Sequence, residues 1–461
     1  MLTNPAHERI NEIESYMLQK GQEYRTIDKS RAGRIYEQLK AHTALPKRTI
    51  QVLGTNGKGS TGRFLALMLM QNGASVVHFT SPHIFSFSER FYKNGAIIGD
   101  DELLKAHRFL QGFDFMAECS YFEYATFLAI TLAQGVDYLI LEAGVGGELD
   151  STSVIARDLC IFSVIDYDHI EILGDSIEAI ATTKLNAVWY PNKVPKMVLG
   201  AQKYKIVEKI AKDIAKAHRV EIFMLDSAKS QNLQYGLPRR FCESARNDDS
   251  FLDSSPTAQN DKIMDCNVDS ANLLAMTENK DFAESTLDSA NPAPFTHKSQ
   301  NLHFLSQNLA LALRALEVLG LKCDLKTLPP LDLRGRFEAI APNIIIDVGH
   351  NQNAAFAIKQ NLGQKKVILV YNSYFQKNIR QILETLQGNI KSVQILRICD
   401  NPRIIGQEVL EQILRSLNIS YKNFDGAKSI RRDENYLVFG SFSVVEAFLR
   451  DYEANKAGMR I

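Results

Sequence analysis

The stretch VLGTNGKGSTGRFLALML, from Val52 to Leu69, decides which fold the sequence is expected to have. Residues 50–53 are typical of a short buried strand, and apolar residues recur at helical spacing over 61–72. The glycines between the two allow backbone conformations in which successive N–H groups point at one anion. The helix adds the positive end of its dipole at the same place. The stretch therefore predicts a strand, an anion-binding loop and a helix.

A lysine and two hydroxyl groups distinguish this loop from an ordinary glycine-rich turn. The glycines alone would favour a turn without a ligand, whereas Lys58, which can neutralise phosphate charge, and the hydroxyls of Ser60 and Thr61 favour a nucleotide. The spacing is shorter than in G-x-x-x-x-G-K-[ST], and Gly59 separates the lysine from the serine. The residues expected to bind the phosphates are Gly54, Thr55, Asn56, Gly57, Lys58, Gly59, Ser60 and Thr61.

Composition excludes several classes of protein. Apolar residues make up 45% and charged residues 23% of the 461 positions, as is ordinary for a globular protein. The 53 basic and 53 acidic residues cancel, so no positive field indicates a nucleic acid partner. No apolar run approaches the ~18 residues of a membrane span, and the polar N-terminal stretch is unlike a signal peptide. The six scattered cysteines fit a reducing compartment. We therefore expect a cytoplasmic protein. We also expect it to be a monomer that acts on small molecules.

Alternating strand and helix patterns predict an α/β fold with two domains. Such alternation favours a parallel sheet that is covered by helices on both faces. The stretch PPLDLRGRFEAI, over 329–340, predicts a hinge, and a new series of strand patterns begins after it. The expected domains are therefore 1–334 and 335–461. Residues 244–294 are rich in Ser, Asn and Asp, so we expect them to be a polar insertion in the first domain.

Polar residues follow the ends of several predicted strands. Gly54, Glu142 and the segment 166–169 each come directly after a buried strand pattern. In parallel sheets, ligands bind outside the carboxyl ends of the strands, so one site could gather all three. A carboxylate at the end of an apolar strand costs free energy unless it is paired or bound to a metal ion, which favours a functional role for Glu142.

Several motifs, in this order, resemble those of one family. They are GTNGKGS (54–60), TSPHI (80–84), ERF (89–91), FEYAT (122–126), LEAGVGGELDSTS (141–153), DHIEILGDS (168–176), QNLALAL (307–313), RGRF (334–337) and IIDVGHN (345–351). The chain is thereby similar to the folylpolyglutamate synthase and dihydrofolate synthase enzymes, within the Mur-type ATP-dependent ligases. The resemblance implies an N-terminal P-loop ATPase domain with a parallel sheet and a smaller, Rossmann-like C-terminal domain. It also implies ADP-forming ligation of L-glutamate to dihydropteroate and to the glutamate tail of tetrahydrofolate.

The resemblance further implies a site for ATP and two Mg²⁺ ions. Ser81 and Glu142 would hold one ion, and His169 would help to hold the second. Taken alone, Ser81 before a proline could be ordinary turn chemistry, and His169 could be an ordinary histidine of the core or surface.

The second domain is expected to close over the nucleotide. By resemblance, Asn308 contacts the adenine end of ATP, Arg336 the phosphates and Asp347 the ribose. His350 would lie beside the adenosine or the transferred phosphoryl group. Without the resemblance, Arg336 and Asp347 could equally be a surface arginine in an ion pair and a solvated loop aspartate.

Lys184 presents a particular problem, because an ammonium ion would repel the metal ions that are expected beside it. The resemblance implies that its amine carries CO₂ as a carbamate and so becomes an anionic oxygen ligand. Burial favours this, since desolvation lowers the pKa of a lysine and frees the neutral amine that reacts with CO₂. The alternative is an exposed helix lysine paired with an acidic neighbour. Thr183, where the family usually has a glutamate, adds weight to that alternative.

The acceptor site is expected around the TID stretch at 26–28, where related enzymes carry a loop that contacts the pterin. A cap of the following helix by Asp28 is an equal alternative. The residues expected to bind the acceptor are Ile27, Asp28, Lys29, Phe122, Glu123, Leu149, Asp150 and Ser151.

Departures from the family pattern leave two other functions open. Glu148 replaces a usual arginine, and Leu185 and Asn186 replace a usual Ala-Gly pair. A non-catalytic ATP-binding homologue, without a working acceptor pocket, is therefore one alternative. The other is a Mur-type ligase for a cell-wall peptide, against which GKGS argues because those enzymes typically have Lys-Thr-Thr.

Overall fold

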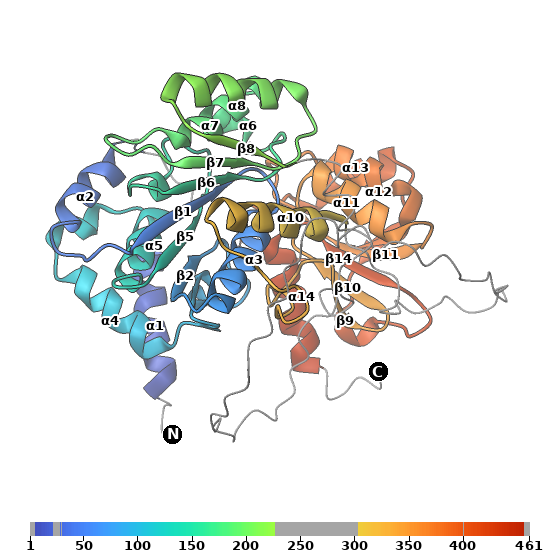
Figure 1. The fold of residues 1–461 in the computed structure, drawn as a ribbon. Coiled ribbons are helices and arrows are strands. Elements are labelled where there is room, and N and C mark those ends of the chain that lie inside the picture. Colours follow the sequence, from blue (N-terminus) through green and yellow to red (C-terminus); the bar gives the residue numbers. More distant parts are fainter. Residues whose placement is uncertain (1–4, 22–27, 29, 226–302, 400, 456–461) are drawn as a thin grey trace.

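The computed structural model describes residues 5–21, 28, 30–225, 303–399 and 401–455. These residues form two sheets with helices on both faces, and so two α/β domains (Figure 1). The expected α/β fold with two domains is therefore confirmed. The strands of the first sheet end at Met224, and those of the second begin at Glu338. The boundary between 334 and 335 stays a prediction, and the expected insertion at 244–294 lies outside the described residues.

The first sheet has the strand order β4-β3-β2-β5-β1-β6-β7-β8. The strands from β2 to β8 run parallel, and β3 and β4 continue the sheet antiparallel beyond β2. The strands are β1 (Arg48–Leu53), β2 (Val76–Phe79), β3 (Phe91–Lys93), β4 (Ala96–Ile97), β5 (Tyr138–Glu142), β6 (Leu159–Phe162), β7 (Lys196–Leu199) and β8 (Ile222–Met224).

Alternating side chains of these strands pack against different helices. Ile50, Val52 and Ile140 point to the face covered by α3 (Lys58–Gln71) and α10 (His303–Val318). Leu139 and Leu141 point to the opposite face, which a second set of helices covers. The helices of that face are α1 (Pro5–Gln19), α2 (Arg31–Leu39), α4 (Asp100–Gln111), α5 (Tyr121–Leu132), α6 (Ile170–Leu173), α7 (Ile177–Leu185) and α8 (Lys205–His218). Period-two burial thus fixes which residues enter each core layer.

The second sheet has the strand order β13-β12-β11-β14-β10-β9, parallel except for β9. Its strands are β9 (Glu338–Ala341), β10 (Ile344–Asp347), β11 (Val367–Tyr371), β12 (Ile390–Ile395), β13 (Tyr421–Asn423) and β14 (Tyr436–Phe439). The helices α11 (Gln352–Leu362), α12 (Ile379–Leu386) and α13 (Gln407–Ser416) cover one face, and α14 (Phe442–Asn455) covers the other. Figure 1 shows α10 and α3 between the two sheets, so one apolar layer joins the domains.

Helix α3 begins earlier than its apolar pattern indicates. The pattern predicts a helix over 61–72, whereas α3 starts at Lys58 because Gly57 adopts a left-handed conformation and caps it. The first turn therefore contains Lys58, Gly59 and Ser60, whose polarity conceals it from a search for apolar periodicity. Backbone N–H groups of this turn are the ones that an intrahelical bond cannot satisfy.

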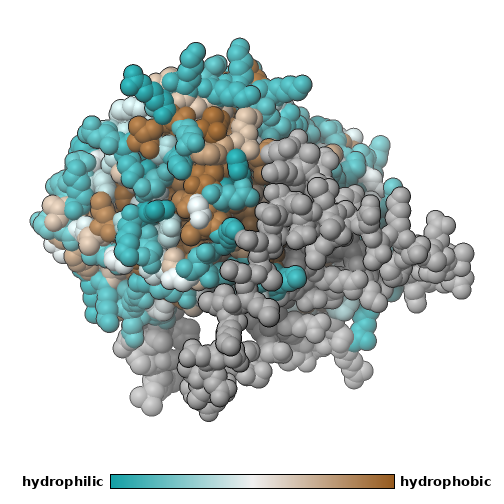
Figure 2. Space-filling view, viewed as in Figure 1, coloured by the Kyte–Doolittle hydropathy of each residue, from teal (hydrophilic) through white to brown (hydrophobic). Residues whose placement is uncertain are grey.

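Hydrophilic residues cover most of the coloured surface in Figure 2, and hydrophobic residues gather near its middle. None of the helices in the described ranges has the length and the apolar character that a membrane crossing requires.

Truncation of a buried strand residue should test whether the domains unfold separately. Ile346, in β10, is fully buried, so Ile346→Ala should destabilise the second domain by about 2–5 kcal/mol. Trp189 is the single tryptophan of the sequence and lies in the first domain. In urea unfolding, the tryptophan fluorescence transition should stay in place, while part of the far-ultraviolet circular dichroism transition moves to lower urea.

The matched variant is Ile140→Ala in β5, which is equally buried and should move the fluorescence transition. Coincident shifts of both signals in both variants would mean that the chain unfolds as one unit.

Candidate active site

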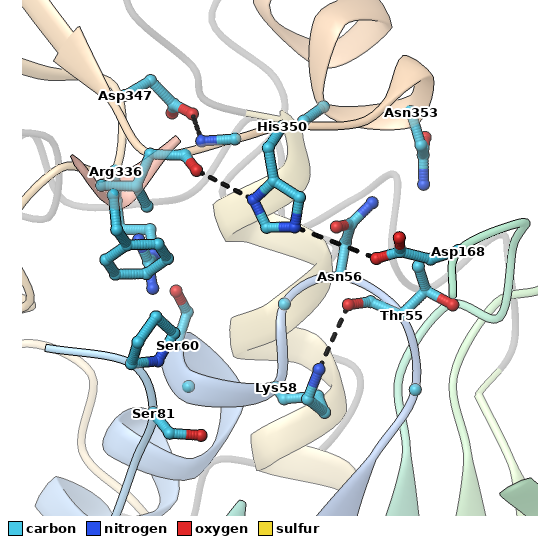
Figure 3. Close-up of a pocket in the computed structure, with 18 of the residues that line it drawn as sticks. Thr55, Asn56, Lys58, Ser60, Ser81, Asp168, Arg336, Asp347, His350 and Asn353 are labelled. Carbon is cyan, nitrogen blue, oxygen red and sulfur yellow. Dashed lines mark hydrogen bonds and ion pairs between the residues drawn. The ribbon is translucent and has the colours of Figure 1, made fainter. Parts of the chain in front are cut away.

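A cleft of about 1100 Å³ lies where the loops at the carboxyl ends of both sheets meet (Figure 3). This is the place at which parallel sheets bind their ligands. The sequence-predicted residues that line it are Gly54, Thr55, Asn56, Gly57, Lys58, Gly59, Ser60, Ser81, Glu142, His169, Lys184, Asn308, Arg336, Asp347 and His350. The expected nucleotide and metal residues are therefore brought together, apart from Thr61, which is fully buried outside the cleft lining.

The glycines of the loop fit so closely that side chains would collide there. Gly57 has φ +85°, and a Cβ atom on it would lie 2.2 Å from Oδ1 of Asn308. A Cβ atom on Gly59 would lie 3.1 Å from Oε2 of Glu142. The loop backbone therefore packs closely against the carboxylate of Glu142 and the amide of Asn308. Without side chains at Gly57 and Gly59, it can also approach a ligand closely.

Two lysines rest on carbonyl groups of the same loop. Nζ of Lys58 donates to the Thr55 carbonyl at 3.2 Å, and Nζ of Lys184 donates to the Gly54 carbonyl at 3.1 Å. Lys184 projects from α7 and is only 4% exposed. Burial, together with the nearby charge of Lys58, lowers the pKa of Lys184 to about 7. The exposed lysine that was the alternative for this position is therefore not what the structure has.

A buried carboxylate and a serine meet on the other side of the loop. Glu142 ends β5, is 5% exposed, and accepts hydrogen bonds from Oγ1 of Thr80 and from the backbone N–H of Ser81 at 3.1 Å. Carboxylate and hydroxyl oxygens are the ligands that Mg²⁺ prefers, and it completes its shell with water and phosphate oxygens. These two residues therefore fit one such ion. Within the described ranges, no three His, Cys, Asp or Glu side chains form a metal-binding group.

Asp168 is the centre of a charged group that the sequence did not assign. Its Oδ1 accepts Nζ of Lys377 at 2.5 Å and the backbone N–H of His169 at 3.0 Å. Its Oδ2 lies 3.8 Å from Nε2 of His169 and 3.9 Å from Nε2 of His350. Burial would raise the pKa of Asp168, but the ammonium of Lys377 on its Oδ1 holds that pKa well below its ordinary value.

Burial keeps both histidines of this group neutral. It lowers the pKa of His169 to about 3 and, together with the charge of Lys377, that of His350 to about 4. The position of Asp168 after a strand was the signal for its role, whereas sequence reasoning did not select Lys377, which lies in the stretch YFQKN (374–378).

Asp347 ties two loops of the second domain together. Its carboxylate accepts the backbone N–H groups of Gly349 at 2.7 Å and of Phe337 at 2.9 Å, and burial raises its pKa to about 6. Arg336 lies beside it, with its guanidinium 5.4 Å from the ring centre of Phe442. Asp347 therefore positions the loop that carries Arg336 and the loop that carries His350.

A reciprocal amide pair joins the two domains at the phosphate-binding loop. Nδ2 of Asn56 donates to Oδ1 of Asn351 at 3.1 Å, and Nδ2 of Asn351 donates to Oδ1 of Asn56 at 2.9 Å. Asn351 also caps α11, so the start of that helix is held against the loop.

Most residues expected to bind the acceptor have structural partners outside the cleft lining. Asp28 accepts the backbone N–H groups of Ser30 and Arg31, but the N-cap residue of α2 is Ser30 and not Asp28, as the helix-cap alternative had it. Glu123 caps α5 and forms an ion pair with Arg31. The ring of Phe122 packs on Gly144.

Leu149, Asp150 and Ser151 form part of a fixed turn. Asp150 accepts N–H groups from Gly144, Val145 and Thr152. Ile27 and Lys29 lie outside the described residues.

Three other side chains line the cleft. They are His83, Arg90 and Tyr121, which sequence reasoning did not select. Nε of Arg90 donates to Nδ1 of His83 at 2.9 Å, and its guanidinium lies 5.3 Å from the ring centre of Tyr121. The TSPHI and ERF motifs contained the signal, because His83 and Arg90 belong to them.

Several known proteins are similar to this chain over most of its length. The crystal structure of Helicobacter pylori folylpolyglutamate synthetase is 35% identical, with a TM-score of 0.68 over 96% of this chain and 98% of that one. The dihydrofolate synthase/folylpolyglutamate synthase of Haemophilus influenzae is 29% identical over 422 residues, 87% of each chain. A bifunctional folylpolyglutamate synthase/dihydrofolate synthase with Mn, AMPPNP and L-glutamate bound shares the fold, at 21% identity and a TM-score of 0.69 over 96% of this chain and 97% of that one. No family model matches the sequence.

The two domains and the cleft with its glycine-rich loop define the class of this protein. It is that of the Mur-type ATP-dependent ligases. Within this class, the chain belongs to the dihydrofolate synthase/folylpolyglutamate synthase family, since the likeness extends over nearly its whole length.

Substitution of Gly57 should test the loop directly. In Gly57→Ala, the new methyl group meets Asn308 and displaces the N–H groups that face the ligand, so affinity for ATP with Mg²⁺ should fall at least about tenfold. Gly73→Ala is the matched control, because Gly73 also has positive φ, +77°, but nothing lies within 4 Å of its Cβ position. Calorimetric titration should give wild-type affinity for the control. Equal losses in both variants would mean that backbone strain, and not the loop, controls binding.

Proposed function

We propose that this chain is an ADP-forming ligase that joins L-glutamate to dihydropteroate and to the glutamate tail of tetrahydrofolate. The γ-phosphoryl group of ATP first passes to the acceptor carboxylate, which is otherwise a poor electrophile. The amine of glutamate then attacks the acyl phosphate, and phosphate leaves. The observation that carries the proposal is the convergence of Lys58 and Lys184 on one glycine-rich loop beside the buried Glu142.

The loop and its cations supply what phosphoryl transfer requires, namely position and neutralised charge. Loop N–H groups at the start of α3 face the phosphates, and Lys58 can turn from the Thr55 carbonyl to a phosphate oxygen. Arg336 brings a second cation from the other domain. Transfer thus depends on both domains.

Glu142 and Ser81 would hold Mg²⁺, and His169 would help to hold a second ion. When bound, the metal ion neutralises phosphate charge and aligns the triphosphate. Figure 3 shows Ser81 on one side of the phosphate-binding loop and Asp168, which precedes His169, on the other. The relative that binds Mn, AMPPNP and L-glutamate supports a divalent metal, a nucleotide and this amino acid for the shared fold.

Lys184 would serve as a carbamate. Its amine is buried between the loop and the charged group at Asp168, and a pKa of about 7 leaves much of it neutral near that pH. Only the neutral amine reacts with CO₂, and the product exchanges a cation for an anionic oxygen beside the expected metal ion.

Glutamate-dependent release of ADP is the experiment that tests the function. We expect release with dihydropteroate and with tetrahydrofolate, from a monomer of the cytoplasm. Activity only with a cell-wall peptide precursor would favour the other Mur-type reaction. ATP binding without release in the presence of any acceptor would indicate a non-catalytic homologue.

Removal of the Lys58 cation from the loop should strongly slow ligation without unfolding the protein. Lys58→Ala loses a charge that is held in place for the moving phosphoryl group, which should cost about 3 kcal/mol or roughly 10²-fold in rate. The rate of ADP release checks this, with circular dichroism as the control for folding. A purified variant that turns over at nearly the wild-type rate would contradict the role of Lys58.

Short carboxylic acids should partly rescue a variant without Lys184. Lys184→Ala should lose most activity, and added acetate or formate should restore part of it by occupying the place of the carbamate oxygens. Lys205→Ala, which removes an exposed lysine of α8, is the control and should respond to neither change. Full activity of Lys184→Ala, or wild-type activity that survives complete removal of CO₂ from a freshly unfolded and refolded sample, would refute the carbamate.

A further inference from the structure

The linker that joins α10 to β9, residues 319–337, lies along helix α3 and runs in the opposite direction. At the end of α3, Nε2 of Gln71 donates to the carbonyl of Asp324 at 2.9 Å, and Oε1 of Gln71 accepts the N–H of Asp324 at 2.9 Å. About two turns earlier in α3, Nη1 of Arg63 donates to Oδ1 of Asp332. The linker is therefore in register with the helix that carries the phosphate-binding loop at its start.

Arg63 is a buried cation whose guanidinium is held from two sides by the first sheet. Its side chain is 2% exposed. Nε donates to Nδ1 of His78, in β2, at 3.2 Å, and the guanidinium carbon lies 3.6 Å from the ring centre of Tyr92, in β3. Burial and the charge of Arg63 lower the pKa of His78 well below its ordinary value, so the imidazole is a neutral acceptor. The carboxylate of Asp332, which is 38% exposed, therefore brings negative charge to Arg63 from the linker.

The ion pair ties a flexible kind of segment to a rigid one. A buried charge is costly unless it is paired, so Arg63 favours the position of the linker in which Asp332 reaches it. Beyond Asp332, the linker turns to the second domain, because Nε of Arg334 and the N–H of Gly335 donate to the carboxylate of Glu338 at 3.1 Å and 2.7 Å. Asp332 therefore marks the point at which the polar contacts of the linker pass from α3 to the second domain.

Arg336 follows so closely that its place depends on this point. Only three residues separate it from Asp332, so the two Cα atoms can be at most about 14 Å apart. A shift of the linker by one residue would move Arg336 by about 3.3–3.6 Å, which is enough to break a hydrogen bond between a guanidinium and a phosphate. Arg336 lines the same cleft as Lys58 and Ser60, which belong to the first turn of α3 (Figure 3).

We propose that Asp332 is a positioning residue for Arg336. By pairing with Arg63 it fixes the linker on α3, and so fixes the distance between the Arg336 guanidinium and the phosphate-binding loop. The inference rests on the proposed function for the role of Arg336 toward the phosphates, and it adds the contact that determines where this cation lies. One helix then positions both cations, Lys58 through its first turn and Arg336 through the ion pair.

A double-mutant cycle on nucleotide affinity tests this dependence, because a positioning residue acts only through the residue that it positions. Asp332→Ala should raise the Kd of ATP with Mg²⁺ about tenfold, as the loss of a charged hydrogen bond to phosphate would. The Kd of adenosine, which has no phosphate, should change less than about threefold. In the Arg336→Met background, Asp332→Ala should raise the Kd of ATP less than about twofold. Calorimetry gives the value for ATP, and competition gives that for adenosine.

Two further variants separate positioning from a general loss of stability. Glu102→Ala is the matched control, because Glu102 also forms an ion pair, with Lys93 at 2.6 Å, is 50% exposed and lies outside the cleft lining. It should bind ATP as the wild type does. Asp332→Asn keeps an oxygen that can accept from Arg63 but has no charge, so the Kd of ATP should rise less than in Asp332→Ala. Circular dichroism checks that each variant is folded.

Equal increases of the ATP Kd in the wild-type and Arg336→Met backgrounds would overturn the positioning role, since Asp332 would then act independently of Arg336. Parallel weakening of ATP and adenosine, or wild-type affinity of either Asp332→Ala or Arg336→Met, would overturn it as well. The cycle needs neither an acceptor nor glutamate. Failure of the wild type to release ADP in a glutamate-dependent reaction would therefore refute the proposed function without deciding the outcome of the cycle.

Discussion

Electrostatic repulsion between the ammonium of Lys58 and the buried amine of Lys184 is the constraint on which the cleft depends. Lys58 and Lys184 rest on the carbonyls of neighbouring residues in one loop, and the charge of Lys58 helps to lower the pKa of Lys184. Carbonyl dipoles offset two ammonium groups only in part, and burial weakens their solvation. A polyphosphate would supply the missing negative charge. The same electrostatics explain why a carbamate at Lys184 would suit the loaded site, because it converts one of the two cations into an anion.

The second half of the site comes from the other domain and is held by polar contacts. Asn56 and Asn351 exchange two hydrogen bonds, and Asp168 receives Lys377. These contacts surround the phosphate-binding loop, whereas the apolar layer of α3 and α10 lies behind it. A polar ligand can replace polar contacts between the domains with contacts of its own, but it cannot replace the contacts within an apolar layer. Exchange of these polar contacts for ligand contacts would leave the shared apolar core covered.

Local patterns in the sequence were sufficient for the fold and for the phosphate-binding loop. Buried strands, amphipathic helices and the glycines around Lys58 are all encoded within a few residues, and the structure has them at the expected places. The role of Asp168 could not be found in this way, because Lys377 is 209 positions away and Asn351 is 295 positions from Asn56. Such contacts follow from strand order, which periodicity does not give. The early start of α3 was missed for a different reason, since its first turn is polar.

Two acidic residues that were expected to bind the acceptor have structural roles instead. Asp150 accepts three backbone N–H groups of its own turn, so its carboxylate is largely committed to holding 144–152 in shape. Glu123 is committed in the same way by its cap and by Arg31. His83, Arg90 and Tyr121 do line the cleft, so we expect them, in place of Asp150 and Glu123, to contact the acceptor. Burial lowers the pKa of His83 to about 3, so the ring stays neutral, and Arg90 carries the charge of this group. An acceptor with a flat ring and a carboxylate matches an aromatic side chain beside a guanidinium, since the ring can pack and the carboxylate can pair.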